Sequence, residues 1–240
     1  MFTGANRADT HSLVTITKPY RIWILVLGIL LLCLTWFLIF SYTSSTRSAK
    51  PCTDFDPSLF QVLPQFLSED ECDALIQQSK ERLKPVMVGM KDSQANQTVR
   101  NNRVCFLKRS SSAVTKKINQ RLSALLQVPV SHFEEIQVGH YREGEFYKKH
   151  SDDALETLKN PRSFTLLMYL NDVNEGGRTA FPNLGIHALP RKGNAILFRP
   201  VEKRNGSYHS LQETVHEAMK IERGEKWIAT IWVHFQPYGS

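Results

Sequence analysis

An uninterrupted apolar run over residues 22–40 constrains this chain most, because its nineteen residues carry no charge. A helix of about that length crosses the ~30 Å hydrocarbon core of a bilayer. Trp23, Trp36 and Tyr42 lie toward its ends, where aromatic rings settle at membrane interfaces. A buried core helix is rarely apolar on every face, and a signal peptide has a shorter apolar region followed by small residues. The run therefore predicts an uncleaved transmembrane anchor over residues 22–42.

Charge and glycosylation motifs indicate how this anchor is oriented. Three basic residues precede the run and two follow it closely, a small excess on the N-terminal side of the kind that cytoplasmic segments carry. Asn96 and Asn205 each begin an acceptor sequon for N-glycosylation. We therefore expect a single-pass type II membrane protein, with a tail over residues 1–21 and a domain in the lumen of the endoplasmic reticulum or Golgi if the source is eukaryotic. In a viral or bacterial source the sequons would carry little meaning.

The rest of the chain has the composition of one ordinary globular domain. Hydrophobic residues make up 42% and charged residues 22% of the sequence, which excludes a disordered protein. Residues 43–58 are rich in Ser, Thr and Pro and predict a linker, so the domain is expected over residues 59–240. The net charge is +7, but Lys and Arg are scattered among Asp and Glu, so a nucleic-acid partner is not expected.

Cysteine usage leaves the redox state open. Cys33 lies in the apolar run, and the other cysteines form no Cys-x-x-Cys pair and no zinc spacing. At most one intrachain disulfide can form among Cys52, Cys72 and Cys105.

Two amphipathic helices are expected in the first part of the domain. Ser68 and Glu71 match a capping box. The apolar residues that follow at helical spacing are Cys72, Leu75, Ile76 and Leu83. A second helix is predicted from the spacing of Val114, Ile118, Leu122 and Leu125, and it ends before Pro129. Between them, residues 89–102 are polar and predict a loop.

From residue 133 onward the sequence changes to short runs of β-branched and aromatic residues between Gly, Pro, Asn and Asp. The clearest runs cover residues 135–141, 163–170, 194–198 and 227–235. Short helices followed by many short strands predict an α+β fold, with a jelly-roll or barrel-like pair of sheets in the C-terminal part.

The residues that could carry chemistry begin with His150 and Asp152. In an extended strand, residues i and i+2 project to the same face, so this pair can offer an imidazole and a carboxylate to one ion. A His-x-Asp sequence alone is more often a surface pair. His216 offers a third ligand, and Lys226 places a cation ten residues beyond it. Two imidazoles and one carboxylate on one face of an iron(II) ion leave its other positions open.

Six segments in the same order resemble the prolyl 4-hydroxylase branch of the iron(II)- and 2-oxoglutarate-dependent dioxygenases, and the resemblance extends over residues 60–238. The segments are 99–107, 141–152, 165–177, 179–182, 190–198 and 216–227. The resemblance implies a double-stranded β-helix, or jelly-roll, over residues 134–238, with supporting N-terminal helices. One departure is Arg178, which stands where the family often has an acidic residue after two glycines.

The resemblance also implies the cofactor site. Its iron ligands would be His150, Asp152 and His216. The far carboxylate of 2-oxoglutarate would be held by Lys226, with hydroxyl groups from Tyr141 and Thr179. Molecular oxygen would be the second substrate, ascorbate would restore over-oxidised iron, and the reaction would hydroxylate peptidyl proline and release succinate and carbon dioxide.

Substrate contacts follow from the same resemblance. Tyr147, Arg162 and Trp232 match positions that line a peptide groove over the iron in similar enzymes. Proline-rich peptides are already extended, so their binding costs little ordering entropy. For Trp232, a role as a core aromatic residue is an equally good interpretation.

Several alternatives stay open on the sequence. His209 competes with His216 for the third ligand position, although only His216 has the ten-residue offset to Lys226. The remaining domain histidines are expected to be structural or exposed: His132, His140, His187 and His234. The same cofactors could serve a substrate other than proline, such as a lysyl side chain, a small molecule or an alkylated base. A catalytically silent, membrane-tethered peptide-binding module is the alternative from another class.

Overall fold

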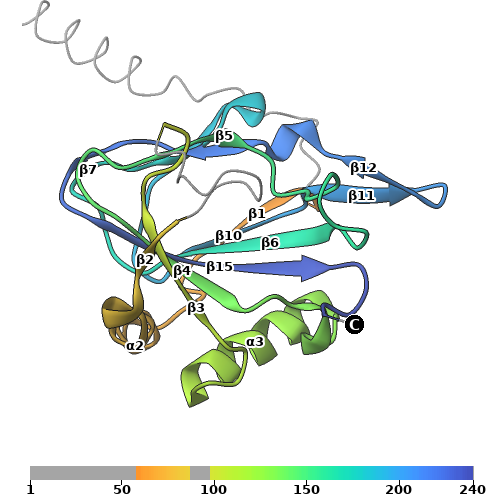
Figure 1. Ribbon diagram of the computed structural model, residues 1–240, viewed down its shortest axis with the longest axis horizontal. Coiled ribbons are helices and arrows are strands. Elements are labelled where there is room, and N and C mark those ends of the chain that lie inside the picture. The colour runs from red at the N-terminus through yellow and green to blue at the C-terminus, as the bar shows by residue number, and fades with distance from the viewer. Residues whose placement is uncertain (1–57, 87–97, 240) are drawn as a thin grey trace, which may run out of the picture. The chain divides into compact units, whose positions relative to one another are not determined.

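A computed structural model of the protein describes residues 58–86 and 98–239 (Figure 1). The predicted anchor, the linker and the Asn96 sequon lie outside these residues, and so does most of the predicted loop over residues 89–102. Among the helices of the described ranges, none combines the length and the apolar character that a bilayer crossing requires.

The larger of two facing sheets has seven strands in the order β1-β10-β6-β15-β4-β3-β2. In chain order, the strands are β1 Phe60–Leu63, β2 Lys84–Pro85, β3 Arg103–Leu107, β4 Ile136–Tyr141, β6 Arg162–Tyr169, β10 Ala195–Phe198 and β15 Lys226–His234. Neighbouring strands of this sheet all pair antiparallel, and β15 lies between β4 and β6. All nine residues of β15 are buried, because both faces of the sheet are covered at this strand.

The smaller sheet has four strands in the order β5-β13-β8-β9. They are β5 Tyr147–His150, β8 Thr179–Phe181, β9 Ile186–Ala188 and β13 His216–Ala218. Two two-stranded sheets complete the strands. One pairs β7 Glu175–Gly176 with β14 Ile221–Arg223, and the other is the hairpin of β11 Val201–Arg204 and β12 Ser207–Ser210. From β4 onward the chain passes back and forth between the seven-stranded sheet and the four-stranded sheet. This arrangement is a mostly-sheet jelly-roll, so the predicted jelly-roll core is confirmed.

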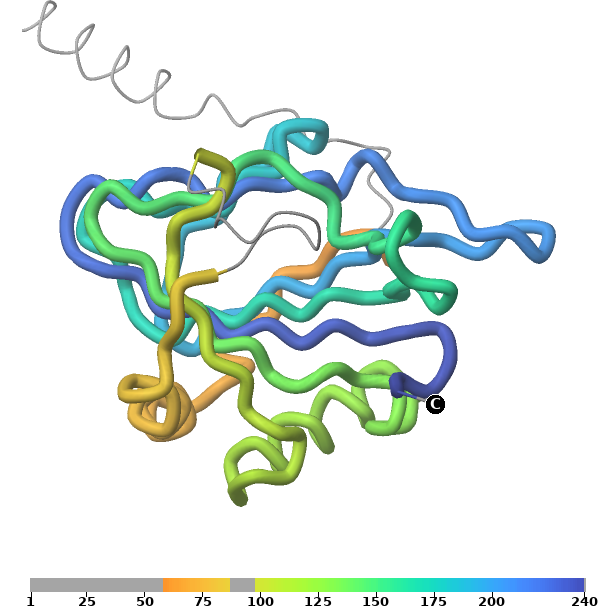
Figure 2. Tube along the Cα trace, viewed as in Figure 1, coloured from red at the N-terminus to blue at the C-terminus, as the bar shows by residue number. Residues whose placement is uncertain are grey.

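Helices α2 (Glu69–Ser79) and α3 (Ala113–Leu126) cover the face of the large sheet that points away from the small one (Figure 2). Ser68 and Glu71 form the predicted capping box. The prediction that Leu83 belongs to this helix is wrong, because α2 ends at Ser79 and continues only as the short 3-10 helix η1, Lys80–Arg82. Lys84 precedes Pro85, and a residue before proline favours an extended backbone. The other 3-10 helices are η2 Val130–His132, η3 Pro182–Leu184 and η4 Gln212–Thr214.

Two apolar layers hold these elements together. One lies between the helices and the large sheet and includes Leu75, Ile118 and Leu122. The other lies between the two sheets and includes Phe181 and Phe198. The large sheet is therefore the middle layer, and the space between the sheets is closed by aromatic residues at one end.

A buried carboxylate joins the two helices. Glu71 is 4% exposed and accepts hydrogen bonds from both terminal nitrogens of Arg121, at 2.9 and 2.7 Å. The same carboxylate closes the capping box on the backbone of Ser68. The Arg121 hydrogen bonds are the main cause that lowers the pKa of Glu71 to about 2.

We expect Glu71→Ala to destabilise the domain by about 3 kcal/mol, because it removes a helix cap and leaves Arg121 without its carboxylate. Asp73→Ala on the same helix is the matched control. The Asp73 side chain is 59% exposed and pairs with Lys192, so its loss should cost less than about 1 kcal/mol. Urea unfolding of both variants measures the difference. Equal losses would show that the Glu71 contact does not join the helices.

Candidate active site

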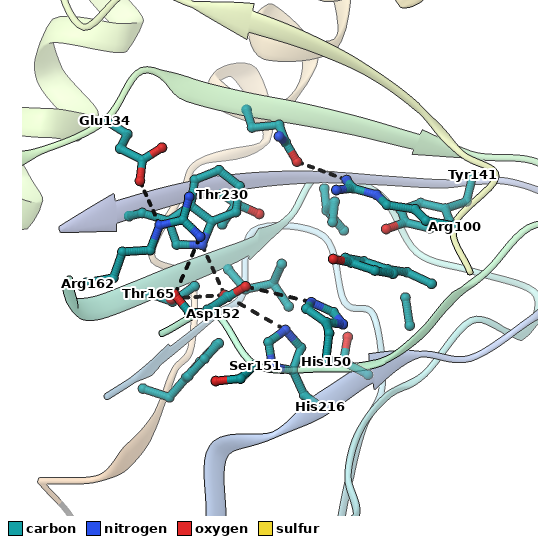
Figure 3. Close-up of a pocket in the computed structure, with 18 of the residues that line it drawn as sticks. Arg100, Glu134, Tyr141, His150, Ser151, Asp152, Arg162, Thr165, His216 and Thr230 are labelled. Carbon is teal, nitrogen blue, oxygen red and sulfur yellow. Dashed lines mark hydrogen bonds and ion pairs between the residues drawn. The ribbon is translucent and has the colours of Figure 1, made fainter. Parts of the chain in front are cut away.

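The small sheet brings three possible metal ligands together. His150 at the end of β5 and His216 at the start of β13 are direct Cα partners in the antiparallel pairing. Asp152 follows β5, and one ligand atom from each of the three residues lies within 4.8 Å of the others. Figure 3 shows the three side chains pointing toward one another. The sequence predicted that His150 and Asp152 share one extended strand. In the structure β5 ends at His150, and hydrogen bonds between Ser151 and Asp153 turn the chain there.

Hydrogen bonds fix which nitrogen each histidine presents. Nδ1 of His150 lies 2.8 Å from the carbonyl oxygen of Lys148, and Nδ1 of His216 lies 3.0 Å from that of Thr214. A carbonyl oxygen only accepts, so each Nδ1 carries the proton and each Nε2 keeps its lone pair. These Nε2 atoms lie 3.7 and 3.9 Å from the Asp152 carboxylate. Two neutral imidazoles and one carboxylate are the donor set of mononuclear iron(II) sites, so the residues fit that ion.

Asp152 is held by groups on the large sheet. Its Oδ2 accepts hydrogen bonds from the Thr165 hydroxyl and from the indole Nε1 of Trp232, both at 3.0 Å. Burial would raise the pKa of Asp152, but its neighbours His216, His150 and Arg162 and the Trp232 hydrogen bond outweigh burial and lower this pKa. Burial is also the main cause that lowers the pKa of His150. An ionised carboxylate beside neutral imidazoles is the protonation state that metal binding requires.

Lys226 lies at the opposite end of the space between the sheets. The residue is 1% exposed, and its Nζ donates to the carbonyl oxygen of Gly177 at 2.6 Å and to Oγ1 of Thr179 at 3.3 Å. Gly177 has φ +63°, and a Cβ there would lie 2.6 Å from a methyl group of Ile221, so only glycine suits this turn. Burial lowers the pKa of Lys226 to about 7. In the described part of the chain, no carboxylate forms an ion pair with this amine.

A cavity of about 250 Å³ connects these groups. Its lining contains every residue that the sequence singled out for the site: Tyr141, Tyr147, His150, Asp152, Arg162, Thr179, His216, Lys226 and Trp232. The Tyr141 ring lies 5.8 Å from Lys226 Nζ, and Tyr141 is the Cα partner of Lys226.

The three residues predicted to line a peptide groove lie near the metal cluster. The Tyr147 ring stacks on the His150 imidazole with 3.6 Å between centroids. The Arg162 guanidinium lies over the Trp232 ring at 4.1 Å. Trp232 combines both interpretations left open by the sequence, since it is 8% exposed, lines the cavity and also fixes Asp152.

Histidines outside the cluster have other partners. His209 lies exposed on β12 and is absent from the cluster, so the structure brings His216 and not His209 to the metal ligands. His140 stacks on Trp227 and lies 2.7 Å from Glu225. His234 is buried and lies 2.9 Å from Glu134, so it has the structural role that the sequence predicted for it.

Sequence reasoning missed four polar groups of the cavity. Arg100 lies over the Tyr147 ring at 4.5 Å and donates to Gln137, while Glu134 accepts from Arg162 at 2.7 Å. Thr165 completes the set through Asp152. Gln137 lies between apolar residues in a strand that is buried throughout. This pattern could have predicted a polar side chain that points into the interior.

Comparisons with known proteins agree with this geometry. Residues 136–234 match the model of the 2OG-Fe(II) oxygenase superfamily. Prolyl 4-hydroxylase 5 of Arabidopsis thaliana is 32% identical over 74% of this chain and 68% of its own length. Prolyl 4-hydroxylase 2 of the same plant is 27% identical over 87% of this chain and 81% of its own length.

Among solved structures, the viral collagen prolyl hydroxylase of Paramecium bursaria Chlorella virus-1, in its 2OG complex, has a TM-score of 0.60 and 28% identity. The match covers 77% of this chain and 98% of that chain. The donor set, the jelly-roll and these relatives lead to one assignment: the chain belongs to the prolyl 4-hydroxylase family within the 2OG-Fe(II) oxygenases.

Proposed function

We propose that this protein hydroxylates proline residues in peptides, with iron(II) as its metal, 2-oxoglutarate and O2 as cosubstrates and ascorbate as the reductant that keeps the iron active. The observation that carries the proposal is one cavity that joins a two-histidine, one-aspartate cluster to a buried lysine. Among residues 58–86 and 98–239, this lysine has no acidic partner. The relatives named prolyl 4-hydroxylase support proline as the target.

His150, Asp152 and His216 hold the metal in this proposal. When bound, iron(II) and 2-oxoglutarate supply the oxidising chemistry, in which O2 gives one oxygen atom to succinate and one to the hydroxylated product, with release of carbon dioxide. The protein keeps both imidazoles neutral and oriented through backbone carbonyls. The bonds from Thr165 and Trp232 occupy Oδ2 of Asp152 and leave Oδ1 as the better donor to the metal.

Lys226, Thr179 and Tyr141 bind the far carboxylate of 2-oxoglutarate. The cavity offers this end of the acid a buried ammonium group and two hydroxyl groups, and charged hydrogen bonds in such a dry site contribute about 1.5 to 3 kcal/mol each. The carboxylate supplies Lys226 with an anion, which no residue of the described chain does.

The peptide lies across Tyr147, Arg162 and Trp232. The Trp232 ring is covered by Arg162, which lines the cavity. Its Nε donates to Glu134 and its Nη1 donates to the carbonyl oxygen of Asp152, so the guanidinium is held flat over the ring. A planar cation of this kind suits backbone carbonyls, and the aromatic ring of Tyr147 offers a wall for a proline ring.

The N-terminal part of the chain makes the protein a single-pass, type II membrane protein in this proposal. Residues 22–42 form the anchor, and the catalytic domain lies in the lumen of the endoplasmic reticulum or Golgi if the source is eukaryotic. The uncharged run over residues 22–40 supports the anchor, and the Asn205 sequon, on the exposed turn between β11 and β12, is available for a glycan.

Purified protein incubated with iron(II), ascorbate, 2-oxoglutarate and a library of proline-rich peptides should add one oxygen atom to proline, with one succinate formed per hydroxylation. Peptides in which alanine replaces proline are the control and should stay unmodified. Mass spectrometry of the fragments locates the oxygen. Succinate formation coupled to lysine instead of proline would refute the substrate assignment but keep the cofactor chemistry.

We expect His216→Ala to weaken iron(II) binding by more than about a hundredfold and to abolish succinate formation, because it removes one of three ligand atoms. His209→Ala is the matched control, since this exposed histidine lies outside the cluster, and it should bind iron normally. Anaerobic iron titration measures both variants. Normal iron binding by His216→Ala would contradict the ligand assignment.

Affinity for 2-oxoglutarate should depend on pH through Lys226. A lysine whose pKa is lowered to about 7 is mostly charged at pH 6 and mostly neutral at pH 8. Binding of the dianion needs the charged form, so affinity should fall about tenfold from pH 6 to pH 8. Lys226→Arg stays charged and should remove the dependence, even if its overall affinity is lower. Calorimetry on the metal-loaded protein without O2 measures the affinity for 2-oxoglutarate at each pH. An affinity of the native protein that does not change with pH would contradict the role of Lys226.

A further inference from the structure

Tyr169 on β6 is a buried tyrosine that lies behind the proposed carboxylate site. The residue is 1% exposed, and its hydroxyl donates to Oγ1 of Thr179 over 2.9 Å. Within residues 58–86 and 98–239, no second hydrogen-bond partner of this hydroxyl is found. Burial raises the pKa of Tyr169, so the hydroxyl keeps its proton and remains a donor.

The Thr179 hydroxyl therefore receives two hydrogen bonds. Tyr169 supplies one, and Lys226 Nζ supplies the other over 3.3 Å. A hydroxyl oxygen has two acceptor lone pairs and one proton, so both of its lone pairs are in use. The proton of Thr179 must then point away from Tyr169 and Lys226, and Thr179 can only donate to a further group.

The opposite arrangement of protons is unfavourable. If Thr179 donated to Tyr169, the tyrosine proton would have no acceptor inside a buried site, which is costly. The buried surroundings of Tyr169 thus set the direction of this hydrogen bond, in which Tyr169 donates and Thr179 accepts. At this end of the cavity, Thr179 and Lys226 are both donors, and a carboxylate, which only accepts when ionised, is the group that satisfies them.

We propose that Tyr169 is a positioning residue that fixes Thr179 as a hydrogen-bond donor and so selects a carboxylate-ended cosubstrate at the Lys226 end of the cavity. This inference rests on the proposed placement of 2-oxoglutarate. Tyr169 does not line the cavity, so it acts only through Thr179 and through its ring, which lies 5.6 Å from Lys226 Nζ.

Tyr169→Phe separates these two contributions, because Phe keeps the ring and removes only the hydroxyl. The dissociation constant of 2-oxoglutarate for the full-length, Mn(II)-loaded protein should rise about fivefold, as for one lost neutral hydrogen bond. The KM for 2-oxoglutarate should rise by the same factor, while the KM for the peptide stays unchanged. Tyr208→Phe, on β12 and outside the cavity lining, is the matched control and should leave both constants at native values.

A double-mutant cycle tests whether Tyr169 acts through Thr179. Thr179→Val alone should weaken 2-oxoglutarate binding, and adding Tyr169→Phe to it should change nothing further. In the Thr179→Ser background, where the hydroxyl is kept, Tyr169→Phe should again cost about fivefold. A purely structural role of Tyr169 would make the two effects add.

The outcomes distinguish this inference from the proposed function. Native affinity for 2-oxoglutarate in Thr179→Val would overturn the placement of the acid itself. Weaker binding in Thr179→Val combined with native binding in Tyr169→Phe, or with additive effects, would overturn only the role of Tyr169. A Tyr169→Phe protein that lost peptide affinity together with acid affinity would overturn that role as well, because its effect would then be general.

Discussion

The antiparallel pairing of β5 with β13 is the constraint on which the site depends. It sets His150 opposite His216, although sixty-six residues separate them along the chain. Each strand contributes one imidazole, and the carbonyl oxygen two residues before each histidine accepts the proton of its Nδ1. A shift of one residue in this register would turn His216 to the other face of the sheet and leave Asp152 with a single imidazole.

Strand β15 links this cluster to the rest of the cavity. Lys226, Thr230, Trp232 and His234 share one face by the two-residue period of a strand, and they run from the buried amine past Asp152 to Glu134. The opposite face of β15 contributes Ala229, Ile231 and Val233 to the apolar layer under α2 and α3. The packing of the helices therefore holds the strand that positions both ends of the site. The Glu71 contact between the helices supports function in this way, although Glu71 does not line the cavity.

Local signals in the sequence predicted the elements and the main site residues. The capping box at Ser68 predicted the start of α2, although the helix ends four residues before Leu83. The spacing of the second helix and the run over residues 227–235 predicted α3 and β15 to within a residue or two. The ligand set needed the resemblance in addition, because the spacing of His216 alone did not exclude His209. The partners of His234 and Asp152 were missed, since Glu134 just before β4 and Thr165 on β6 lie far from them along the chain, and only the pairing of the strands brings them close. The predicted anchor lies outside the described residues.

The balance of charge in the cavity explains why its two ends are built so differently. Asp152 and Lys226 are both buried, and neither forms an ion pair with the other. Asp152 is kept ionised by its neighbours His216, His150 and Arg162 and by hydrogen bonds, whereas burial alone leaves the pKa of Lys226 low. A dication held by His150, Asp152 and His216 and a dianion held by Lys226 would together add no net charge, and each would supply the opposite charge at its end of the cavity. Because Asp152 and Lys226 lie at opposite ends of the cavity, a metal together with a keto acid that carries a distant carboxylate complements the cavity better than either charge alone.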